Sequence, residues 1–181
     1  MVPVEIIHLS LPGLKLVRLS ILEDPRGSFR ESYQKNRYTG HGIACDFLQD
    51  NLSFSKKDVI RGMHFQSDPG QAKLVSVVQG KIFDVAVDIR LGSPTFGKWE
   101  GVYLDASQGE QLFIPVGFAH GFCVVSETGA HVLYKVSTIY NPETEKSFRF
   151  DDPQVKIEWP TLNPLISQRD QNAPLLQEIF S

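Results

Sequence analysis

Hydrophobic and polar positions alternate with a period of two in several short segments of this chain, most clearly in residues 81–90. The odd-numbered positions from Phe83 to Ile89 are apolar and would share one face, whereas Asp84 and Asp88 would lie on the other. Successive side chains of a β-strand point to opposite faces of the sheet, so this pattern predicts a strand.

Similar apolar segments follow one another along the chain, and turn-forming residues separate them. The chain contains 14 glycines and 11 prolines and has no long stretch of helical periodicity. Helix is expected only over residues 33–38 and 175–180. Further strands are predicted at residues 14–22, 45–53, 59–66, 74–79, 98–104, 111–115, 121–125 and 130–138. Many short strands at fairly regular spacing favour an all-β fold, a β-sandwich or jelly-roll barrel with a few short helices.

The length of 181 residues suffices for one domain with a sizeable core. No repeat, low-complexity tract or linker divides the chain, so we predict a single jelly-roll domain over residues 1–181. The 18 basic and 21 acidic residues give a net charge of −3. This balance argues against general binding to a nucleic acid polymer or an anionic membrane, and it leaves a local site for a small anion open.

The sequence also favours a cytoplasmic location. No apolar run approaches the about 18 residues that a membrane-spanning helix needs. The first twenty residues lack the charged and then apolar pattern of a secretory signal. Cys45 and Cys123 lie far apart and form no CxxC pair, which indicates free thiols in a reducing compartment or small buried residues.

Residues 59–66 combine an arginine, a glycine and a histidine in one predicted strand. Strict alternation would place Arg61 and His64 on opposite faces, whereas a bulge at Gly62 would bring both toward one face. Bulges often occur beside active sites. From this segment alone, the default interpretation is a structural histidine and a surface arginine.

A second histidine stands among glycines in residues 114–122, where a small turn would deliver His120 onto a new strand. The PxGxxH pattern resembles the second metal motif of the cupins, which are small jelly-roll barrels. Their first metal motif needs two histidines on one strand, and His64 stands alone there. A three-histidine metal site is therefore not supported, and no metal is expected.

Tyr134 and Tyr140 would share one face of the segment at residues 131–140. One phenol would then act as a proton donor and the other as a stacking surface, although two core tyrosines with backbone partners are the commoner case.

Basic residues occur singly in several turns and strands, at Arg26, Arg61, Lys73 and Arg169. Each alone indicates a solvated surface charge, but together in one pocket they would suit a diphosphate, which arginine binds bidentately. The chain has neither GxxxxGK[ST] nor GxGxxG, so no P-loop or Rossmann cofactor site is indicated.

These segments occur in the order of one known family. The matching segments are DPRGSFRE at residues 24–31, QDN at 49–51, RGMHFQ at 61–66, DVAVDIR at 84–90 and PVGFAHGF at 115–122. From about residue 14 to 174 the chain closely resembles the dTDP-4-dehydrorhamnose 3,5-epimerase family. The resemblance implies a cupin-like jelly roll and a homodimer without metal or cofactor, in which an N-terminal strand crosses to the neighbouring pocket. The substrate it implies is a dTDP-linked 4-keto-6-deoxyhexose.

The resemblance also implies roles for four residues. A ketone at C4 acidifies the hydrogens at C3 and C5, so inversion needs a base, an opposing acid and a group that stabilises the enolate. His64 would be the base and Asp170 would hydrogen-bond it, Tyr134 would be the acid, and Lys73 would stabilise the enolate oxygen.

The remaining contacts that the family implies bind the nucleotide and the sugar. Tyr140 would stack on thymine. The other contacts would be Arg26, Glu31, Gln49, Asp50, Asn51, Arg61, His120, Glu145 and Arg169. The chain departs from the family pattern at Arg169, where lysine is usual, at Met63, where leucine is common, and at Ser28, which is often aromatic.

Three alternatives stay open at this point. A relative with the same residues would invert only C3 or C5 of another dTDP-4-keto-6-deoxysugar. A metal-dependent cupin oxygenase would need a stoichiometric metal. A carbohydrate-binding jelly roll would bind the nucleotide sugar without exchanging any hydrogen.

Overall fold

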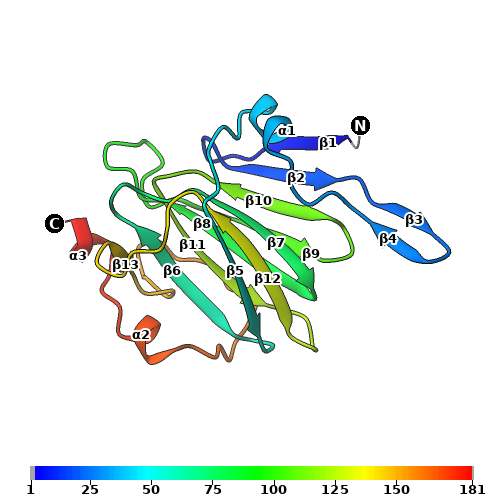
Figure 1. The fold of residues 1–181 in the computed structure, drawn as a ribbon. Helices are drawn as coiled ribbons and strands as arrows, with labels where there is room; N and C mark the ends of the chain where they lie inside the picture. Colours follow the sequence, from blue (N-terminus) through cyan, green and yellow to red (C-terminus); the bar gives the residue numbers. More distant parts are fainter. Residues whose placement is uncertain (1–2, 181) are drawn as a thin grey trace.

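Two antiparallel sheets packed face to face form the molecule in this computed structural model, which describes residues 3–180 (Figure 1). In spatial order, the first sheet contains β1 (Val4–His8), β2 (Lys15–Leu19), β10 (Glu110–Ile114), β7 (Lys73–Gln79), β12 (Ala130–Val136) and β5 (Gln49–Ser55). The second sheet contains β13 (Glu145–Ser147), β6 (Ile60–Gln66), β11 (Phe118–Val124), β8 (Lys81–Asp88) and β9 (Trp99–Asp105). The predicted all-β jelly roll is confirmed.

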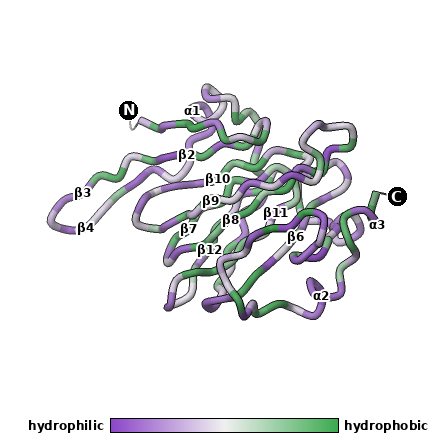
Figure 2. Tube along the Cα trace, turned by 180° about the vertical axis from the view of Figure 1, so that it is seen from behind, coloured by the Kyte–Doolittle hydropathy of each residue, from purple (hydrophilic) through white to green (hydrophobic). Residues whose placement is uncertain are grey.

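Smaller elements surround the two sheets. A hairpin of β3 (Leu22–Asp24) and β4 (Gly27–Phe29) projects beyond the first sheet (Figure 1). The helices are α1 (Lys35–Gly40), α2 (Gln168–Gln171) and α3 (Leu176–Phe180). Within the described residues, no helix has the length and apolar character needed to cross a membrane. Figure 2 shows hydrophilic residues at the tip of the β3–β4 hairpin and along α2.

The expected strands coincide with observed ones, with shifts of a few residues at their ends. The shift that matters for the site concerns β11, which begins at Phe118, so His120 lies inside the strand and not on the turn before it. The sequence pattern missed β1, β3, β4, β13 and α2, which have between three and five residues each. Such short elements carry too few positions for a period to be read.

The second sheet is covered on both faces. On its inner face, Ile82 and Ala86 of β8 pack against Leu112 of the first sheet in one core cluster. On its outer face, Phe83 and Val85 pack against the segment that follows β13 in a second cluster, whose C-terminal members include Phe148, Val155 and Leu176. The C-terminal segment therefore acts as a third layer over the sheet.

A bulge interrupts the pairing of β6 with β11. His64 lies opposite His120 and Arg61 lies opposite Phe122, so the two residues between them on β6 face a single residue on β11. Gly62 has a φ of +137°, and a Cβ there would come within 2.6 Å of the Gly121 Cα. The bulge at Gly62, which was the alternative to the default interpretation of this segment, is present, and both Arg61 and His64 line the interior cavity.

Gly62→Ala should destabilise the protein because its Cβ would meet backbone atoms that cannot move aside. Gly27→Ala is a matched control, since Gly27 has a similar φ of +131° and a Cβ added there would meet no atom within 4 Å. We expect Gly62→Ala to lower the free energy of unfolding by about 1–3 kcal/mol more than Gly27→Ala does. Denaturant titration measures both, and equal losses would contradict the tight approach of β6 and β11.

Candidate active site

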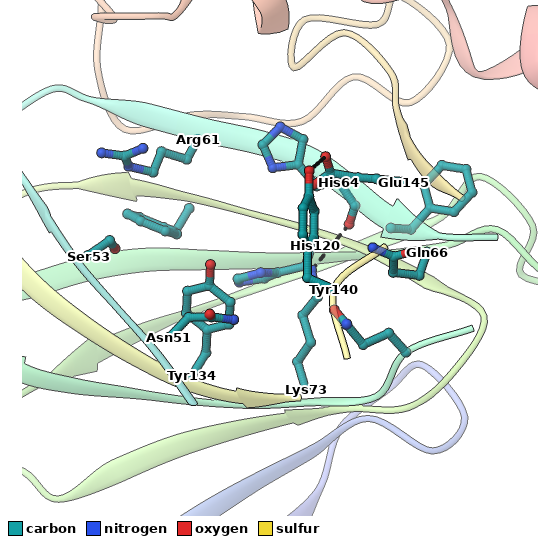
Figure 3. Close-up of a pocket in the computed structure, with 13 residues that line it drawn as sticks. Asn51, Ser53, Arg61, His64, Gln66, Lys73, His120, Tyr134, Tyr140 and Glu145 are labelled. Carbon is teal, nitrogen blue, oxygen red and sulfur yellow. Dashed lines mark hydrogen bonds between the residues drawn. The ribbon is translucent and has the colours of Figure 1, made fainter. Parts of the chain in front are cut away.

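A cavity of about 230 Å³ opens between the two sheets (Figure 3). Strands β5, β7 and β12 line it from the first sheet, and β6, β11 and β13 line it from the second. It brings together eight residues that the sequence singled out: Asn51, Arg61, His64, Lys73, His120, Tyr134, Tyr140 and Glu145. Residues distant in sequence therefore converge on one site with both acidic and basic character.

His64 lines this cavity and forms a pair with the buried Asp170 behind it. His64 Nε2 donates to Asp170 Oδ1 at 2.7 Å, and the side chains are 26% and 5% exposed. Burial alone would raise the pKa of Asp170, but the hydrogen bond and charge of His64, together with the hydrogen bonds from Gly62 and Ser167, outweigh it, and the net pKa lies below the usual value. Ser167 caps α2 and accepts from the Asp170 backbone N–H. Helix α2 thus holds a carboxylate that orients the histidine and stabilises its protonated form.

Tyr134 faces the cavity from the opposite sheet. Figure 3 shows Tyr134 and Lys73 extending into the cavity from one side, while Arg61 and His64 come from the other. Burial raises the pKa of the Tyr134 phenol, and the Arg61 charge opposes this only in part. The phenol is therefore protonated at neutral pH and is able to donate a proton.

Lys73 lies at the floor of the cavity and is only 7% exposed. Burial lowers its pKa from 10.5 to about 8, and the negative charges of Asp84 and Glu145 oppose that shift. Its Nζ donates to the His64 backbone oxygen at 3.4 Å. At neutral pH the ammonium form still predominates, so the floor presents a positive charge.

A second histidine–carboxylate pair lies beside the first. His120 Nε2 donates to Asp84 Oδ1 at 2.8 Å, and both side chains are buried. Burial lowers the pKa of His120, and Asp84 opposes the shift. Asp84 was not among the residues predicted for the site. A carboxylate in an otherwise apolar strand was the available signal, because a buried charge requires a partner.

Hydrogen bonds connect the residues at the rim. Tyr140 OH donates to Glu145 Oε2 at 3.1 Å, and Arg169 Nη2 donates to the same oxygen at 2.6 Å. Gln49 donates to Asn51 at 2.8 Å and accepts from the Tyr140 backbone N–H at 2.9 Å. Gln49 and Arg169 therefore join the site through their neighbours.

Three residues named for the site lie elsewhere in this chain. Arg26 is exposed on the β3–β4 hairpin and pairs with Asp24. Glu31 pairs with Arg37 beside α1. Asp50 points away from the cavity and pairs with Lys135, because it alternates with Gln49 and Asn51 along β5. The structure does not bring these three to the cavity of their own chain.

Further residues line the cavity that the sequence analysis did not assign to it. They are Ser53, Phe65, Gln66, Gln71 and Phe122. Most are polar or aromatic side chains in strands, which the sequence alone does not distinguish from ordinary sheet residues. Over residues 3–180, no three histidine, cysteine or acidic side chains cluster as metal ligands would.

Comparison with known proteins shows close relatives over most of the chain. A family model described as dTDP-4-dehydrorhamnose 3,5-epimerase matches residues 8–178. A protein of that name from Shigella flexneri is 46% identical over 169 residues, which cover 92% of this chain and 93% of the relative. Another from Neisseria gonorrhoeae is 47% identical over 167 residues, or 92% of this chain, and the match spans about half (51%) of that relative.

Solved structures agree with this result. A 3,5-epimerase from Legionella pneumophila, crystallised in complex with dTDP-4-keto-L-rhamnose, superposes with a TM-score of 0.94 at 48% identity and covers 98% of this chain and 95% of its own. A relative from Streptomyces niveus carries a narrower name, dTDP-4-dehydrorhamnose 3-epimerase, and is 45% identical over 157 residues, 86% of this chain and 75% of the relative.

The His64–Asp170 pair predicts a pH-dependent contribution to stability. The folded-state pKa of Asp170 lies below its ordinary value of 3.8, so the carboxylate stabilises the fold above that pH and loses this effect as pH falls through the folded-state pKa. Asp170→Asn should lower the free energy of unfolding by about 1–3 kcal/mol near neutral pH. The difference in free energy of unfolding between Asp170→Asn and the unchanged protein should become smaller below about pH 4.

Denaturant unfolding between about pH 3 and pH 7 measures this difference. Asp50→Asn is the control, because it removes a carboxylate from an exposed ion pair and should cost less than about 1 kcal/mol. A constant Asp170→Asn penalty down to pH 3 would contradict the assigned pair.

Proposed function

The chain belongs to the dTDP-4-dehydrorhamnose 3,5-epimerase family, and we propose that its cavity inverts C3 and C5 of dTDP-4-dehydro-6-deoxy-D-glucose to give dTDP-4-dehydro-L-rhamnose. The observation that carries this proposal is the position of three groups around one cavity. A histidine–carboxylate pair faces it from one sheet, and a protonated tyrosine and a buried lysine face it from the other. An enolate mechanism requires these three functions.

His64 is the proposed base. The C4 ketone acidifies the hydrogen on each neighbouring carbon, and the imidazole takes that proton. Because Nε2 is bonded to Asp170, Nδ1 is the nitrogen that would accept it. The Asp170 carboxylate then stabilises the imidazolium that forms.

Lys73 is the proposed partner of the enolate oxygen. Removing the proton places negative charge on the C4 oxygen, and a buried ammonium stabilises that charge far better than water would. Loss of this side chain should cost about 3 kcal/mol of transition-state stabilisation. Tyr134 then returns a proton from the opposite face, which inverts the carbon.

The rim residues are proposed to bind the nucleotide. Tyr140 is 48% exposed beside the cavity and offers a ring for stacking on thymine. Arg61 lines the cavity and is braced by Ser55, to which its Nε donates at 2.8 Å. Arg61 and Arg169 would provide the guanidinium groups for the diphosphate.

A narrower activity is the second candidate. The Streptomyces niveus relative, named as a 3-epimerase, is nearly as similar in sequence as the 3,5-epimerases. The base, acid and lysine would be the same for one inversion or two, so the two activities are separated by product analysis.

The experiment that tests the function follows hydrogen exchange at the sugar. The protein is incubated with dTDP-4-keto-6-deoxyglucose in deuterated water, and C3 and C5 are observed by NMR. We expect deuterium at both carbons; label at one carbon alone would favour the narrower activity, and label at neither in folded protein would overturn the proposal.

Two variants separate the proposed base from the proposed acid in the same assay. His64→Asn should abolish exchange at both carbons, with a loss of on the order of 10²- to 10⁴-fold in rate. Tyr134→Phe should lose inversion by a similar factor while proton removal by His64 continues, so exchange should exceed inversion. Equal loss of exchange and inversion in Tyr134→Phe would contradict the assignment of the two roles.

We propose that the chain acts as a homodimer in which Arg26 and Glu31 serve the cavity of the partner. Both residues lie away from their own cavity, and the β3–β4 hairpin projects outward with Leu22 and Phe29 exposed. Leu52 and Phe54 also leave apolar surface on the outer face of the first sheet. Exposed apolar surface of this kind is typical of a protein interface.

Light scattering and subunit mixing test this assembly. We expect a mass of twice 20.3 kDa. Arg26→Ala should raise KM, and mixing it with inactive His64→Asn should restore normal KM in the mixed dimers, because one cavity then has both an intact His64 and the partner's Arg26. A monomeric mass, or no rescue on mixing, would contradict the proposal.

The proposal also includes a single domain over residues 1–181 and a cytoplasmic location. The shared core of the two sheets supports the first, and the free thiols of Cys45 and Cys123 support the second.

A further inference from the structure

The carboxylate of Asp84 is buried behind His120, one of the residues that line the cavity, and has one oxygen unsatisfied. Asp84 lies on the inner face of β8 and is 0% exposed. Its Oδ1 accepts from His120 Nε2 at 2.8 Å, whereas Oδ2 has no hydrogen-bond partner among the described residues. A buried carboxylate oxygen of this kind is costly unless a nearby positive charge compensates it.

Lys73 is the cation whose charge is coupled to this carboxylate. Its ammonium is buried on β7, across the interior from β8, and donates at 3.4 Å to the His64 backbone oxygen. Two carboxylates favour its charged form, Asp84 more strongly than Glu145. Among the described residues no direct ion pair joins Lys73 to Asp84, so their electrostatic attraction acts over a longer distance than a direct ion pair.

Glu145 is less suited to compensate the lysine. Its Oε2 already accepts from Arg169 Nη2 at 2.6 Å and from Tyr140 OH at 3.1 Å. Its negative charge is therefore shared with an arginine at the rim, and Asp84 remains the carboxylate without a cationic partner in direct contact.

The other groups that face Lys73 supply no negative charge at neutral pH. His120 of β11 is kept neutral because burial lowers its pKa. Tyr134 of β12 is kept protonated because burial raises its pKa. His64 of β6 has an imidazole side chain, which carries no negative charge. Asp84 is thus the main negative charge that balances the ammonium at the cavity floor.

We propose that Asp84 is a positioning residue for the epimerisation, whose carboxylate keeps the buried Lys73 in the ammonium form. Figure 3 shows Lys73 extending into the cavity. It acts through Lys73 and His120 and does not itself contact the sugar. The inference rests on the proposed function, in which the Lys73 ammonium stabilises the enolate oxygen.

The proposal predicts a shift in the pH dependence of catalysis. With Asp84 present, the pKa of Lys73 is about 8, so the ammonium is present below that pH and is lost as pH rises through it. Without the carboxylate, burial would lower the pKa further, and the ammonium would be lost at a lower pH. Removal of a nearby opposite charge commonly shifts a pKa by about 1–3 units.

Asp84→Asn is the direct test, because asparagine has nearly the same shape and its oxygen still accepts from His120. We expect the alkaline limb of the kcat/KM profile to shift to lower pH by about one pH unit or more. The loss of kcat/KM relative to the unchanged protein should then be roughly tenfold larger at pH 8 than at pH 6. A purely structural role would lower kcat/KM by one factor at every pH, and that result would overturn the proposal.

Titration of Lys73 itself gives a second readout that needs no turnover. In protein with ¹³C-labelled lysine, the Lys73 Cε resonance should titrate at lower pH in Asp84→Asn than in the unchanged protein, and an unchanged midpoint would overturn the proposal. Asp84→Ser offers a smaller neutral side chain should the asparagine variant not fold. Failure of the unchanged protein to exchange C3 or C5 would count against the proposed function alone, because this titration would still report on Asp84.

Two controls complete the test. Arginine stays charged without a carboxylate, so Asp84→Asn introduced into Lys73→Arg should not move the alkaline limb. Asp105→Asn removes a carboxylate from neighbouring β9, outside the cavity, and should leave both the profile and the Lys73 titration unchanged. A shift of equal size in the Lys73→Arg background would show that Asp84 acts through another group.

Discussion

The close approach of β6 to β11 at two glycines is the constraint on which the site depends. Gly62 and Gly121 lie too near each other for any side chain, and the bulge between them places His64 opposite His120 while Arg61 turns to the same interior. A regular strand pair would send one of Arg61 and His64 to the outer face. The same bulge therefore places both the proposed base, His64, and the proposed diphosphate contact, Arg61, at the cavity.

The C-terminal segment connects the stability of the fold to the chemistry of the site. It covers the outer face of the second sheet with apolar side chains such as Phe148 and Leu176, and the same segment carries α2. Helix α2 places Asp170 against His64. Folding of this layer onto the sheet thus brings Asp170 to His64. A chain without the layer would lose part of its core and also the carboxylate that pairs with His64.

The strands could be predicted from the sequence because alternation and turn residues are local signals. Helix α2 could not, since its four residues, Gln168–Gln171, have no period of their own and form where tertiary contacts hold Asp170. The role of Asp84 was also hidden, because alternation separates two faces without showing that both are buried. For Asp50, in contrast, the sequence pattern was sufficient. The period of two along β5 places Asp50 on the face opposite to Gln49 and Asn51, and therefore away from the cavity. The family resemblance, and not periodicity, brought Asp170 and Lys73 into the site.

The central claim is that His64 and Tyr134 face one sugar ring from opposite sheets, with Lys73 at its C4 oxygen. A crystal structure with a bound, unreactive dTDP-hexose tests this most directly. The account predicts that the ring lies between the imidazole and the phenol, with the oxygen on C4 within hydrogen-bond distance of the Lys73 Nζ. A ring with both groups on the same face, or one bound away from Lys73, would contradict it.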